Sequence, residues 1–470
     1  MAIFKKNIGR DVIQKIHDCT MQVMEEKGIR FVSKQARNVF AEHGFRIDGE
    51  IVYFAEKQIM DAVNQVPERF VLHGRDPQYD LEIGNGKPVF IPAYGPVFIS
   101  RNEDVRSAVH TDCVNFMKLS QNSPVIDIMN PYVVTPSDVE KDDLLMYQQA
   151  LCLKYGSKPT MSITAGYEAS KKAIQTIKAV NQKDPSDYVT IGLISALSPL
   201  SFDETMIGGL FAFAEEGQPV IIGCGALPGA TSPVSILGTM ITATAELLAG
   251  ITLAQLIHPG LPCIYGNVAA GTDLSYVTPA IGTPEAARIA ALSKAMCEFY
   301  HIPCRGGGSL CDAKQTDFEA GSESALVILA SLEAGLDFII HATGILDSFN
   351  IIGYEKFLLD EQNIQAFQFM LREPDLDNDI IGMDTIMEVP HSMQYLEEDH
   401  TFDYMREELF VPKISLHGYF DSWKSKGSQT LVEKASVAVD RRLESYVAPE
   451  LTVEQDAVLA PYLNINFLEA

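Results

Sequence analysis

The sequence has little positive charge. Its 470 residues include 36 Lys and Arg against 62 Asp and Glu, a formal net charge of −26 at pH 7. Nucleic acids and anionic membranes attract basic surfaces, so this balance disfavours both as partners. The apolar share of 47% and the charged share of 21% are those of ordinary globular chains, which excludes a disordered or low-complexity protein.

Paired cysteines and a signal sequence are also missing. None of the eight cysteines forms a CxxC motif, and the opening MAIFKKNIGRDVIQKIHD carries charges where a signal peptide needs an apolar run. We therefore expect a reduced, cytoplasmic protein. One apolar stretch, residues 236–257, is long enough to cross a bilayer. It contains Glu246 and Gln255 and leads into a turn and a second apolar run, which favours a buried helix.

Short apolar runs that stop at Gly, Pro, Ser or Asn recur along the chain, most of them separated by 20 to 40 residues with helical spacing. Eight such runs are expected to be strands: Val89 to Ala93, Val125 to Asn130, Thr160 to Thr164, Tyr188 to Ser195, Val220 to Cys224, Cys263 to Asn267, Cys304 to Leu310 and Phe338 to Thr343. Eight successive βα units favour a closed parallel barrel, because a barrel leaves no edge strand uncovered. The fold class we predict is therefore α/β, a TIM (β/α)8 barrel.

The segments on either side of the barrel have a different pattern. Residues 1–75 are expected to form an N-terminal helical layer, residues 76–370 the barrel, and residues 371–470 a C-terminal helical extension. No Gly/Ser linker separates these parts, so we expect flanking layers on one barrel. The region around the first strand also has the pattern of β-hairpins, in FVLHG, YDLEIGNGKPVFI and GPVFIS.

Strand direction sorts the candidate site residues, because such barrels hold their active sites at the carboxyl ends of the strands. The residues expected at this upper end are Tyr94, Asn130, Tyr132, Ser162, Thr164, Ser195, Ser198, Asn267, Asp312, Lys314, His341, Ser348, Phe349 and Tyr354. His341 is the only histidine expected there. These residues also have purely structural interpretations: Asp312 and Lys314 form a local ion pair, and His341 is a hydrogen-bonded core residue.

Metal and nucleotide sites are disfavoured by spacing. Cys224 and Cys311 are expected at the upper end, but zinc needs three or four ligands and no further Cys or His follows at the usual spacing. No Ser-His-Asp triad is evident. The glycines at 223–229 do not form a dinucleotide fingerprint. The run Gly306 to Gly308, in the seventh strand, can bring backbone amides close to an anion, because glycine permits close approach and many barrels bind phosphate or carboxylate after strands seven and eight.

Five ordered motifs resemble the trimethylamine methyltransferase superfamily, specifically its members without pyrrolysine. They are TAELLAGITLAQLIHPGLPCIYGN, TPAIGTPEAARIAAL, GGGSLCDAKQTDFEAGSESAL, ATGILDSFNIIGYEKFLLDEQ and DHTFDYMREELFVPKIS. The resemblance covers nearly the whole chain. It implies a TIM barrel that passes a methyl group from a methylamine to the Co(I) corrinoid of a separate partner protein, with no tightly bound cofactor of its own.

The same resemblance narrows the substrate. Pyrrolysine members carry that residue near the end of the seventh strand, which corresponds to about Ser309 to Cys311, where this chain has ordinary residues. A quaternary ammonium group needs no proton donor to leave, because it departs as a neutral tertiary amine. Methyl transfer from glycine betaine, giving dimethylglycine, is therefore the implied reaction. Relatives that act on proline betaine, carnitine or γ-butyrobetaine supply the alternatives.

The upper-end residues fit a betaine. A trimethylammonium group prefers aromatic faces, for which Tyr94, Phe349 and Tyr354 are the candidates, at about 0.5 to 2 kcal/mol each. A carboxylate needs donors, which His341 or the amides around Gly307 can supply. The predicted substrate-binding set is completed by Asn267, with polar support from Asp312 and Lys314, and includes no acid/base residue and no metal.

Other classes of function stay open on the sequence alone. A zinc-dependent thiol methyltransferase or a phosphate-binding barrel lyase would use the same fold, and a non-enzymatic betaine-binding protein would use the same site without the transfer. We expect a homo-oligomer that meets a quaternary amine and a corrinoid protein.

Overall fold

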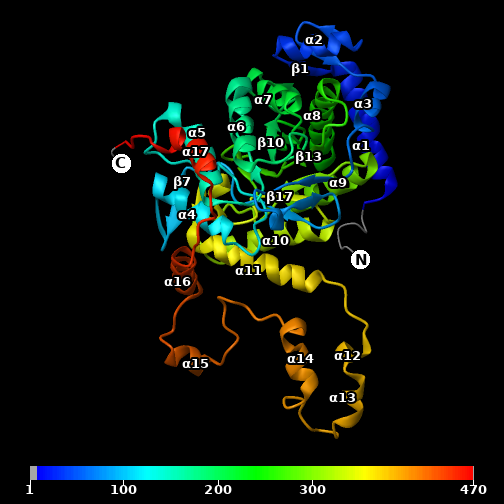
Figure 1. Cartoon of the computed structure of the whole chain (residues 1–470). Coiled ribbons are helices and arrows are strands. Elements are labelled where there is room, and N and C mark those ends of the chain that lie inside the picture. Colours follow the sequence, from blue (N-terminus) through cyan, green and yellow to red (C-terminus); the bar gives the residue numbers. More distant parts are fainter. Residues whose placement is uncertain (1–7, 469–470) are drawn as a thin grey trace.

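Parallel strands form a barrel at the centre of the computed structural model, which describes residues 8–468 (Figure 1). Their order in the sheet is β6, β17, β16, β13, β12, β10 and β9. The bounds are β6 (Val89–Phe90), β9 (Thr160–Met161), β10 (Thr190–Ser195), β12 (Val220–Cys224), β13 (Cys263–Asn267), β16 (Cys304–Gly307) and β17 (Phe338–Ile340). The predicted α/β barrel is confirmed.

The second predicted strand closes the barrel without being a regular strand. The amide of Asp127 donates to the carbonyl oxygen of Phe90 (2.9 Å), and the amide of Met129 donates to that of Pro159 (2.8 Å). The amide of Met161 returns a 2.8 Å bond to the Met129 carbonyl oxygen. Residues 127–129 thus bridge β6 and β9, so all eight predicted segments take part in the barrel.

A helix follows each barrel segment or its loop. The helices are α4 (His110–Gln121), α5 (Lys141–Tyr155), α6 (Gly166–Asn181), α7 (Glu204–Glu215), α8 (Ile236–Ile257), α9 (Pro284–Tyr300), α10 (Phe318–Ala334) and α11 (Tyr354–Leu371). Side-chain caps fix where several begin: Asp203, Ser235 and Asp317 each accept from a backbone amide three residues on. Among the described residues, α8 is the one helix long and apolar enough to cross a membrane, and 72% of that apolar window is buried in the protein.

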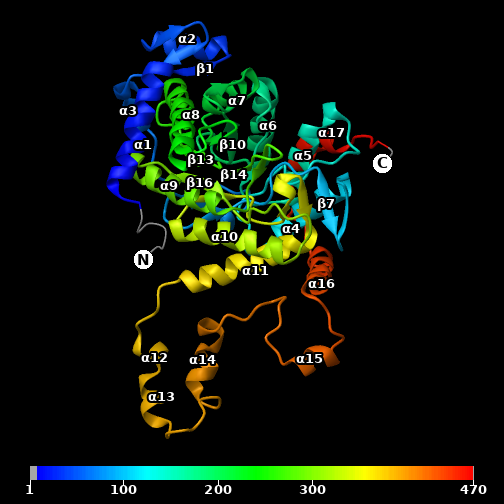
Figure 2. The same cartoon turned by 180° about the vertical axis from the view of Figure 1, so that it is seen from behind.

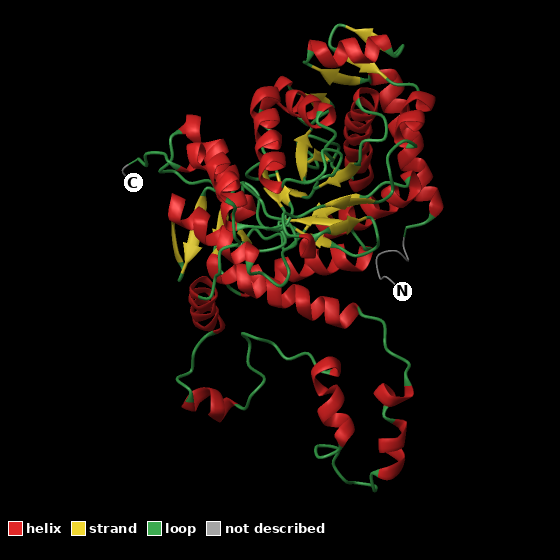
Figure 3. Cartoon of the chain, in the orientation of Figure 1, coloured by secondary structure: helices red, strands yellow, loops and turns green. Residues whose placement is uncertain are grey.

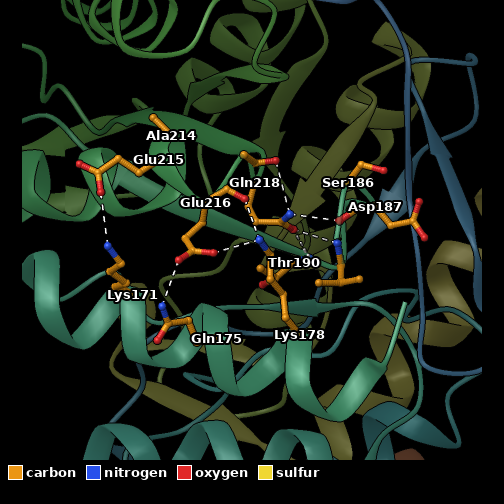
Figure 4. Close-up of polar contacts among 12 residues, drawn as sticks. Lys171, Gln175, Lys178, Ser186, Asp187, Thr190, Ala214, Glu215, Glu216 and Gln218 are labelled. Carbon is orange, nitrogen blue, oxygen red and sulfur yellow. Dashed lines mark hydrogen bonds and ion pairs between the residues drawn. The ribbon is translucent and has the colours of Figure 1, made fainter. Parts of the chain in front are cut away.

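The amino end of the barrel is closed. An apolar layer that includes Ile191, Ile221 and Ile264 fills the lower interior, and the ribbon of β4 (Phe70–Leu72) and β5 (Leu81–Ile83) packs against it. Nearby, the Gln218 side chain accepts from the amide of Val189 (2.9 Å) and donates to the carbonyl oxygen of Asp187 (3.1 Å). Figure 4 shows this contact beside the ion pairs that join α6 to α7. A substrate therefore enters from the carboxyl end.

The N-terminal layer differs from the prediction, since it is not only helical. A sheet of β1 (Ile29–Phe31), β2 (Arg46–Asp48) and β3 (Ile51–Tyr53) accompanies α1 (Arg10–Gln22), the π-helical turn η2 (Val23–Lys27), α2 (Lys34–Glu42) and α3 (Glu56–Val63). β1 also pairs with β11 (Ser201–Phe202), and Phe31 stacks on Phe202 with ring centroids 5.1 Å apart. Three-residue strands are too short to show an alternating pattern in sequence.

Two small sheets lie at the carboxyl end of the barrel. One joins β18 (Ile345–Leu346), β19 (Ile351–Gly353), β7 (Phe98–Arg101) and β8 (Asp104–Ser107), and the other pairs β14 (Gly271–Asp273) with β15 (Thr278–Ala280). Single 3-10 turns, η3 (Pro77–Tyr79) and η4 (Asp347–Phe349), lie in the connections. The hairpins predicted around the first strand thus occur, as β4 with β5 and as β7 with β8.

The C-terminal extension is not a flanking layer throughout. Residues 372–430, here called the arm, run away from the barrel and carry α12 (Asn378–Ile381), α13 (Met383–Glu388), α14 (Asp399–Glu408) and α15 (Phe420–Ser425) (Figures 1 and 2). Only α16 (Leu431–Glu444) and α17 (Val453–Leu463) pack back, against α11 and α5 respectively. Figure 3 shows that long loops connect the helices of the arm. A helical pattern in sequence does not reveal whether a helix packs on its own chain.

Candidate active site

Two neighbouring strands bring His341 and Tyr94 together at the carboxyl end of the barrel. His341 follows β17 and Tyr94 follows β6, which pairs with β17. The backbone amide of Tyr94 donates to Nδ1 of His341 (3.2 Å), so the ring hydrogen of the neutral imidazole sits on Nε2. That nitrogen is a donor. His341 is 6% exposed and has a left-handed backbone (φ 62°), a strained conformation that is common at functional sites.

Four rings lie next to one another along this edge. The Tyr94 and Tyr132 centroids are 5.0 Å apart, those of Tyr94 and His341 are 6.5 Å apart, and those of His341 and Phe349 are 4.6 Å apart. We call these four residues the aromatic row. Phe349 reaches His341 through a turn in which Asp347, Ser348 and Phe349 all have positive φ, from 48° to 81°. Such a run of left-handed residues stores strain that the surrounding structure must hold.

Arg305 lies beside the aromatic row. It is the second residue of β16, the strand next to β17, and is 2% exposed. Its Nε has no hydrogen-bond partner, and within residues 8–468 no carboxylate is in ion-pair distance of its guanidinium. Buried charges are ordinarily paired. Burial lowers the pKa of Arg305 to about 10, so it stays a cation at neutral pH. An unpaired buried cation is a site for an anion.

Burial, with a smaller contribution from the charge of Arg305, sets the protonation state of the neighbouring side chains. Burial first, and the Arg305 charge second, hold the pKa of His341 well below its usual range, so His341 is neutral at pH 7. Burial raises the pKa of Tyr94 to about 12, which a hydrogen bond with Thr164 and the Arg305 charge oppose. Burial likewise raises the pKa of Tyr132. The site therefore holds one fixed cation and neutral aromatic rings.

Further buried polar atoms without protein partners gather at the ends of the same strands. They are the hydroxyl groups of Ser162, Ser309 and Thr343, which follow β9, β16 and β17. A buried hydroxyl without a partner costs free energy, on the order of 1 to 3 kcal/mol. These three hydroxyl groups therefore have hydrogen-bonding capacity that the protein itself does not use.

Two predicted site residues lie elsewhere. Tyr354, the first residue of α11, packs flat on Phe116 of α4 (centroids 4.3 Å apart), and its hydroxyl donates to Asp112 (2.9 Å). Asn267 ends β13, but its side-chain amide donates to Ser293 of α9 (3.0 Å), which directs it into the helical layer. Both hold helices in place. Tyr354 was misplaced because β18 and β19 carry the chain away from the mouth before α11 begins.

The glycines and the Asp312 region have structural roles. A Cβ on Gly307 would lie 2.4 Å from Leu310, so this glycine makes room for that side chain. A Cβ on Gly308 would lie 2.5 Å from the His341 carbonyl oxygen, so Gly308 lets the end of β16 approach the chain after β17. The Gly308 amide already donates to Ile340 (2.9 Å). It is thus not available for a carboxylate.

The predicted ion pair between Asp312 and Lys314 is wrong. Lys314 pairs with Asp347 (2.8 Å) and donates to the backbone oxygen of Asp312. The Asp312 carboxylate accepts from the amide of Gly282 (2.8 Å) and from the Ser348 hydroxyl. Together these bonds brace the turn that carries Phe349, so Asp312 and Lys314 support the site from outside it.

The cysteines at the upper end are buried and separate. Cys224 donates its thiol hydrogen to Glu246 (2.8 Å), which also accepts from Ser198 (2.7 Å) and from the amide of Leu200 (2.7 Å). Burial raises the pKa of Cys224 well above its usual value. Cys311 is also buried. Across residues 8–468 no three His, Cys, Asp or Glu side chains are grouped as a metal site.

Sequence reasoning missed Arg305 and left Tyr132 outside the predicted site. The signal for Arg305 was a charged residue inside CRGGG, a strand otherwise made of small residues. A charge in the interior of a barrel strand needs a partner, and the sequence offers none within the strand. Tyr132 was placed at the upper end, but spacing could not show that it contacts Tyr94.

Comparisons with known proteins identify the family of this chain. The model of the trimethylamine methyltransferase (MTTB) family matches residues 4–466, and the chain belongs to that family. It is 33% identical to a glycine betaine methyltransferase of Desulfitobacterium hafniense, over 97% of this chain and 96% of the relative. It is 30% identical to a proline betaine:corrinoid methyltransferase of Eubacterium limosum, over 98% and 97% of the two chains.

More distant relatives include methyltransferases that are named for methylamines. The chain is 25% identical to a trimethylamine methyltransferase of Desulfitobacterium hafniense, over 94% of this chain and 90% of the relative. Among solved structures, the monomethylamine methyltransferase of Methanosarcina barkeri superposes with a TM-score of 0.52 at 11% identity, covering 94% of each chain. That likeness supports the barrel fold.

Proposed function

We propose that this protein transfers a methyl group from glycine betaine to the Co(I) corrinoid of a partner protein, leaving dimethylglycine. The observation that carries the proposal is the unpaired buried cation of Arg305 next to the aromatic row. Glycine betaine has one carboxylate and one trimethylammonium group. The carboxylate would pair with Arg305 and accept from Nε2 of His341, and the ammonium group would lie on the ring faces.

Arg305 would orient the substrate as well as bind it. Its positive charge repels the trimethylammonium group and attracts the carboxylate, so one of the two possible orientations is favoured. The neutral state of His341 fits the same arrangement, because a protonated imidazole would add a second cation near the ammonium group. The rings of Tyr94, Tyr132 and Phe349 lie toward the mouth side of β6 and β17 and are partly exposed. Methyl groups held there face the open end.

The transfer requires alignment more than acid/base chemistry. The Co(I) corrinoid supplies the nucleophile. The bond from nitrogen to the transferred methyl carbon breaks, nitrogen keeps the electron pair, and neutral amine leaves without taking up a proton. The residues of this chain bind the two charged ends and hold the methyl carbon in line with the C–N bond, which places the reacting atoms within attack distance.

A partner that brings cobalt to this methyl group must dock at the mouth, because the amino end is plugged. The loops around the mouth and the first residues of α8 and α10 present large apolar side chains to solvent: Leu197, Val234, Leu237, Leu274, Tyr276, Val277 and Phe318. Tyr276 is 79% exposed and Phe318 is 88% exposed. Exposed apolar clusters of this kind mark protein interaction sites. We assign this surface, called the mouth patch, to the corrinoid protein.

Related betaines share the features that the site recognises. Proline betaine, carnitine and γ-butyrobetaine each combine a quaternary ammonium group with a carboxylate, and relatives of this chain are named for the first two. They differ in the distance between the two charges and in bulk, so the relative rates measure the space between Arg305 and the aromatic row.

The test is a spectroscopic assay with reduced free cobalamin. The purified protein is mixed with Co(I) cobalamin and one amine at a time, and formation of methyl-Co(III) is followed by absorbance. Methyl transfer is expected from glycine betaine, and none above background from trimethylamine, dimethylamine or dimethylglycine, which lack a quaternary nitrogen. Equal rates with trimethylamine would show that a quaternary leaving group is not what the site requires.

A zinc-dependent thiol methyltransferase would give a different result. Its activity would need a thiol acceptor and would be lost on removal of zinc, whereas the proposed transfer uses neither. A betaine-binding protein without activity would bind glycine betaine and leave the cobalamin spectrum unchanged.

A further inference from the structure

The carboxylate of Asp312 bonds two segments that belong to different parts of the barrel mouth. One of its oxygens accepts from the hydroxyl group of Ser348, and the other accepts from the backbone amide of Gly282 (2.8 Å). Ser348 lies in the turn that carries Phe349 of the aromatic row, and Gly282 follows the hairpin of β14 and β15. One carboxylate therefore joins the substrate site to a loop of the mouth.

The hairpin of β14 and β15 supplies three of the seven side chains of the mouth patch. Leu274, Tyr276 and Val277 lie at its tip and are each more than half exposed. Its two strands have three residues each, and a two-stranded ribbon is marginally stable by itself in water. The conformation of the tip therefore depends on what holds the base, and Gly282 lies two residues after β15 ends.

The base of the hairpin packs tightly against α10. A Cβ on Gly282 would lie 2.7 Å from the side chain of Glu323, so the backbone at this position lies directly on that side chain. The Glu323 carboxylate accepts in turn from the amides of Asp312 (2.7 Å) and Ala313 (3.2 Å). We call Gly282, Asp312 and Glu323 the joint. Closely packed groups transmit displacement, so a shift of one member of the joint moves the others.

The turn that carries Phe349 is held from the same joint. Its residues Asp347, Ser348 and Phe349 all have left-handed backbones, which ordinary side chains rarely adopt. The amide of Asp347 donates to the carbonyl oxygen of Ala313 (3.0 Å), and that of Ser348 donates to Cys311 (3.2 Å). Strain of this kind persists only where the surroundings impose it, and it is common in segments that switch between conformations. A ligand that contacts Phe349 therefore acts on the joint.

We propose that Asp312 is a positioning residue that couples the substrate site to the docking surface. A betaine whose ammonium group lies on Phe349 favours the present arrangement of the turn, and the bonds from Ser348 and Gly282 to Asp312 then hold the hairpin in place. The corrinoid protein thus meets a complete mouth patch when substrate is bound, and Co(I) is not directed to an empty site. Such coupling is reciprocal, so docking also strengthens betaine binding. The inference rests on the proposed function.

Hydrogen exchange with glycine betaine provides the test, and it needs no corrinoid protein. Exchange of the backbone amides of residues 271–283 is followed by mass spectrometry in the wild type, without betaine and with betaine at a saturating concentration. Betaine is expected to slow this exchange by at least about fivefold, which is the lower end of typical coupling between two sites. Calorimetry on the same samples measures whether betaine binds.

Two substitutions break the connection without removal of a residue from the aromatic row. Ser348→Ala deletes the hydroxyl group that donates to Asp312 and keeps the backbone bonds of the turn. Asp312→Asn leaves a single acceptor atom, which cannot serve both Ser348 and Gly282. With betaine at a concentration that saturates each variant, exchange of residues 271–283 should slow by less than about twofold.

Ser322→Ala is the matched control for these variants. The Ser322 hydroxyl lies on α10 and donates to the carbonyl oxygen of Glu319 (3.0 Å), outside the joint. This variant should show the same slowing as the wild type. Loss of the slowing in Ser322→Ala as well would show a general effect of serine removal and would overturn the assignment to Asp312.

Two further outcomes overturn the inference and leave the proposed function intact. One is betaine binding without slower exchange at residues 271–283. The other is equal slowing in the wild type, Ser348→Ala and Asp312→Asn, because that result means that the substrate covers the hairpin directly. Absence of betaine binding in calorimetry overturns the proposed function together with the inference, so calorimetry distinguishes the two failures.

Discussion

Replacement of Arg305 by Met separates binding of the substrate carboxylate from every structural role. Removal of one partner from a buried charged pair costs about 2 to 5 kcal/mol, which corresponds to roughly a 30-fold to 4,000-fold loss in kcat/KM for glycine betaine. Methionine keeps the length of the side chain. No carboxylate of the protein loses a partner, because Arg305 has none. The free energy of unfolding is therefore expected to equal or exceed that of the wild type.

Two comparisons make this prediction specific. Tetramethylammonium has the cation without the carboxylate, so its transfer to Co(I) cobalamin should change by less than about threefold on Arg305→Met. Arg75→Met is the matched control, since Arg75 donates to the carbonyl oxygens of Leu153 and Gly156 (3.0 Å each) and is structural. That variant should lose stability and keep its preference for glycine betaine. Equal losses with both substrates, or a marked fall in stability for Arg305→Met, would refute the role of Arg305.

Three further predictions concern the neighbours of the site. The pKa of His341 in the folded protein lies below its unfolded value near 6.5, so the unfolded state binds more protons and stability falls as pH drops below about 6.5. Denaturant titrations at pH 7.5 and 5.5 should show this fall in the wild type and a smaller one in His341→Asn; identical falls would contradict it. Tyr354→Phe should leave the kinetics for glycine betaine unchanged and lower the free energy of unfolding by about 0.5 to 1.5 kcal/mol, because it removes the bond to Asp112. Tyr276→Asp should slow transfer to the corrinoid protein and leave transfer to free cobalamin unchanged, and parallel losses with both acceptors would argue against docking at the mouth patch.

The barrel was predictable because each strand is a short apolar run that ends at a turn residue, and because eight such units in series have few possible arrangements. The irregular segment at 127–129 still followed that pattern. The N-terminal sheet was not predictable, since its strands are three residues long. Its strand β1 also pairs with β11, which lies about 170 residues further along the chain.

The position of several candidate site residues was predictable from strand direction. Strand direction placed Tyr94, His341 and Phe349 at one end of the barrel, and the structure brings them into contact. It could not show which way a side chain points at the end of a strand, so Asn267 was assigned to the mouth although it faces α9. Arg305 was missed because a charged residue within a strand carries no periodic signal.

The central claim is that one intact methyl group passes from a betaine nitrogen to cobalt. The most direct measurement uses glycine betaine with three deuterated methyl groups, the protein, and Co(I) cobalamin in a single turnover, with both products analysed by mass spectrometry. The account predicts trideuteromethyl cobalamin and dimethylglycine with two deuterated methyl groups, in equal amounts. Loss of betaine without label on cobalt, or loss of deuterium from the transferred methyl group, would contradict it.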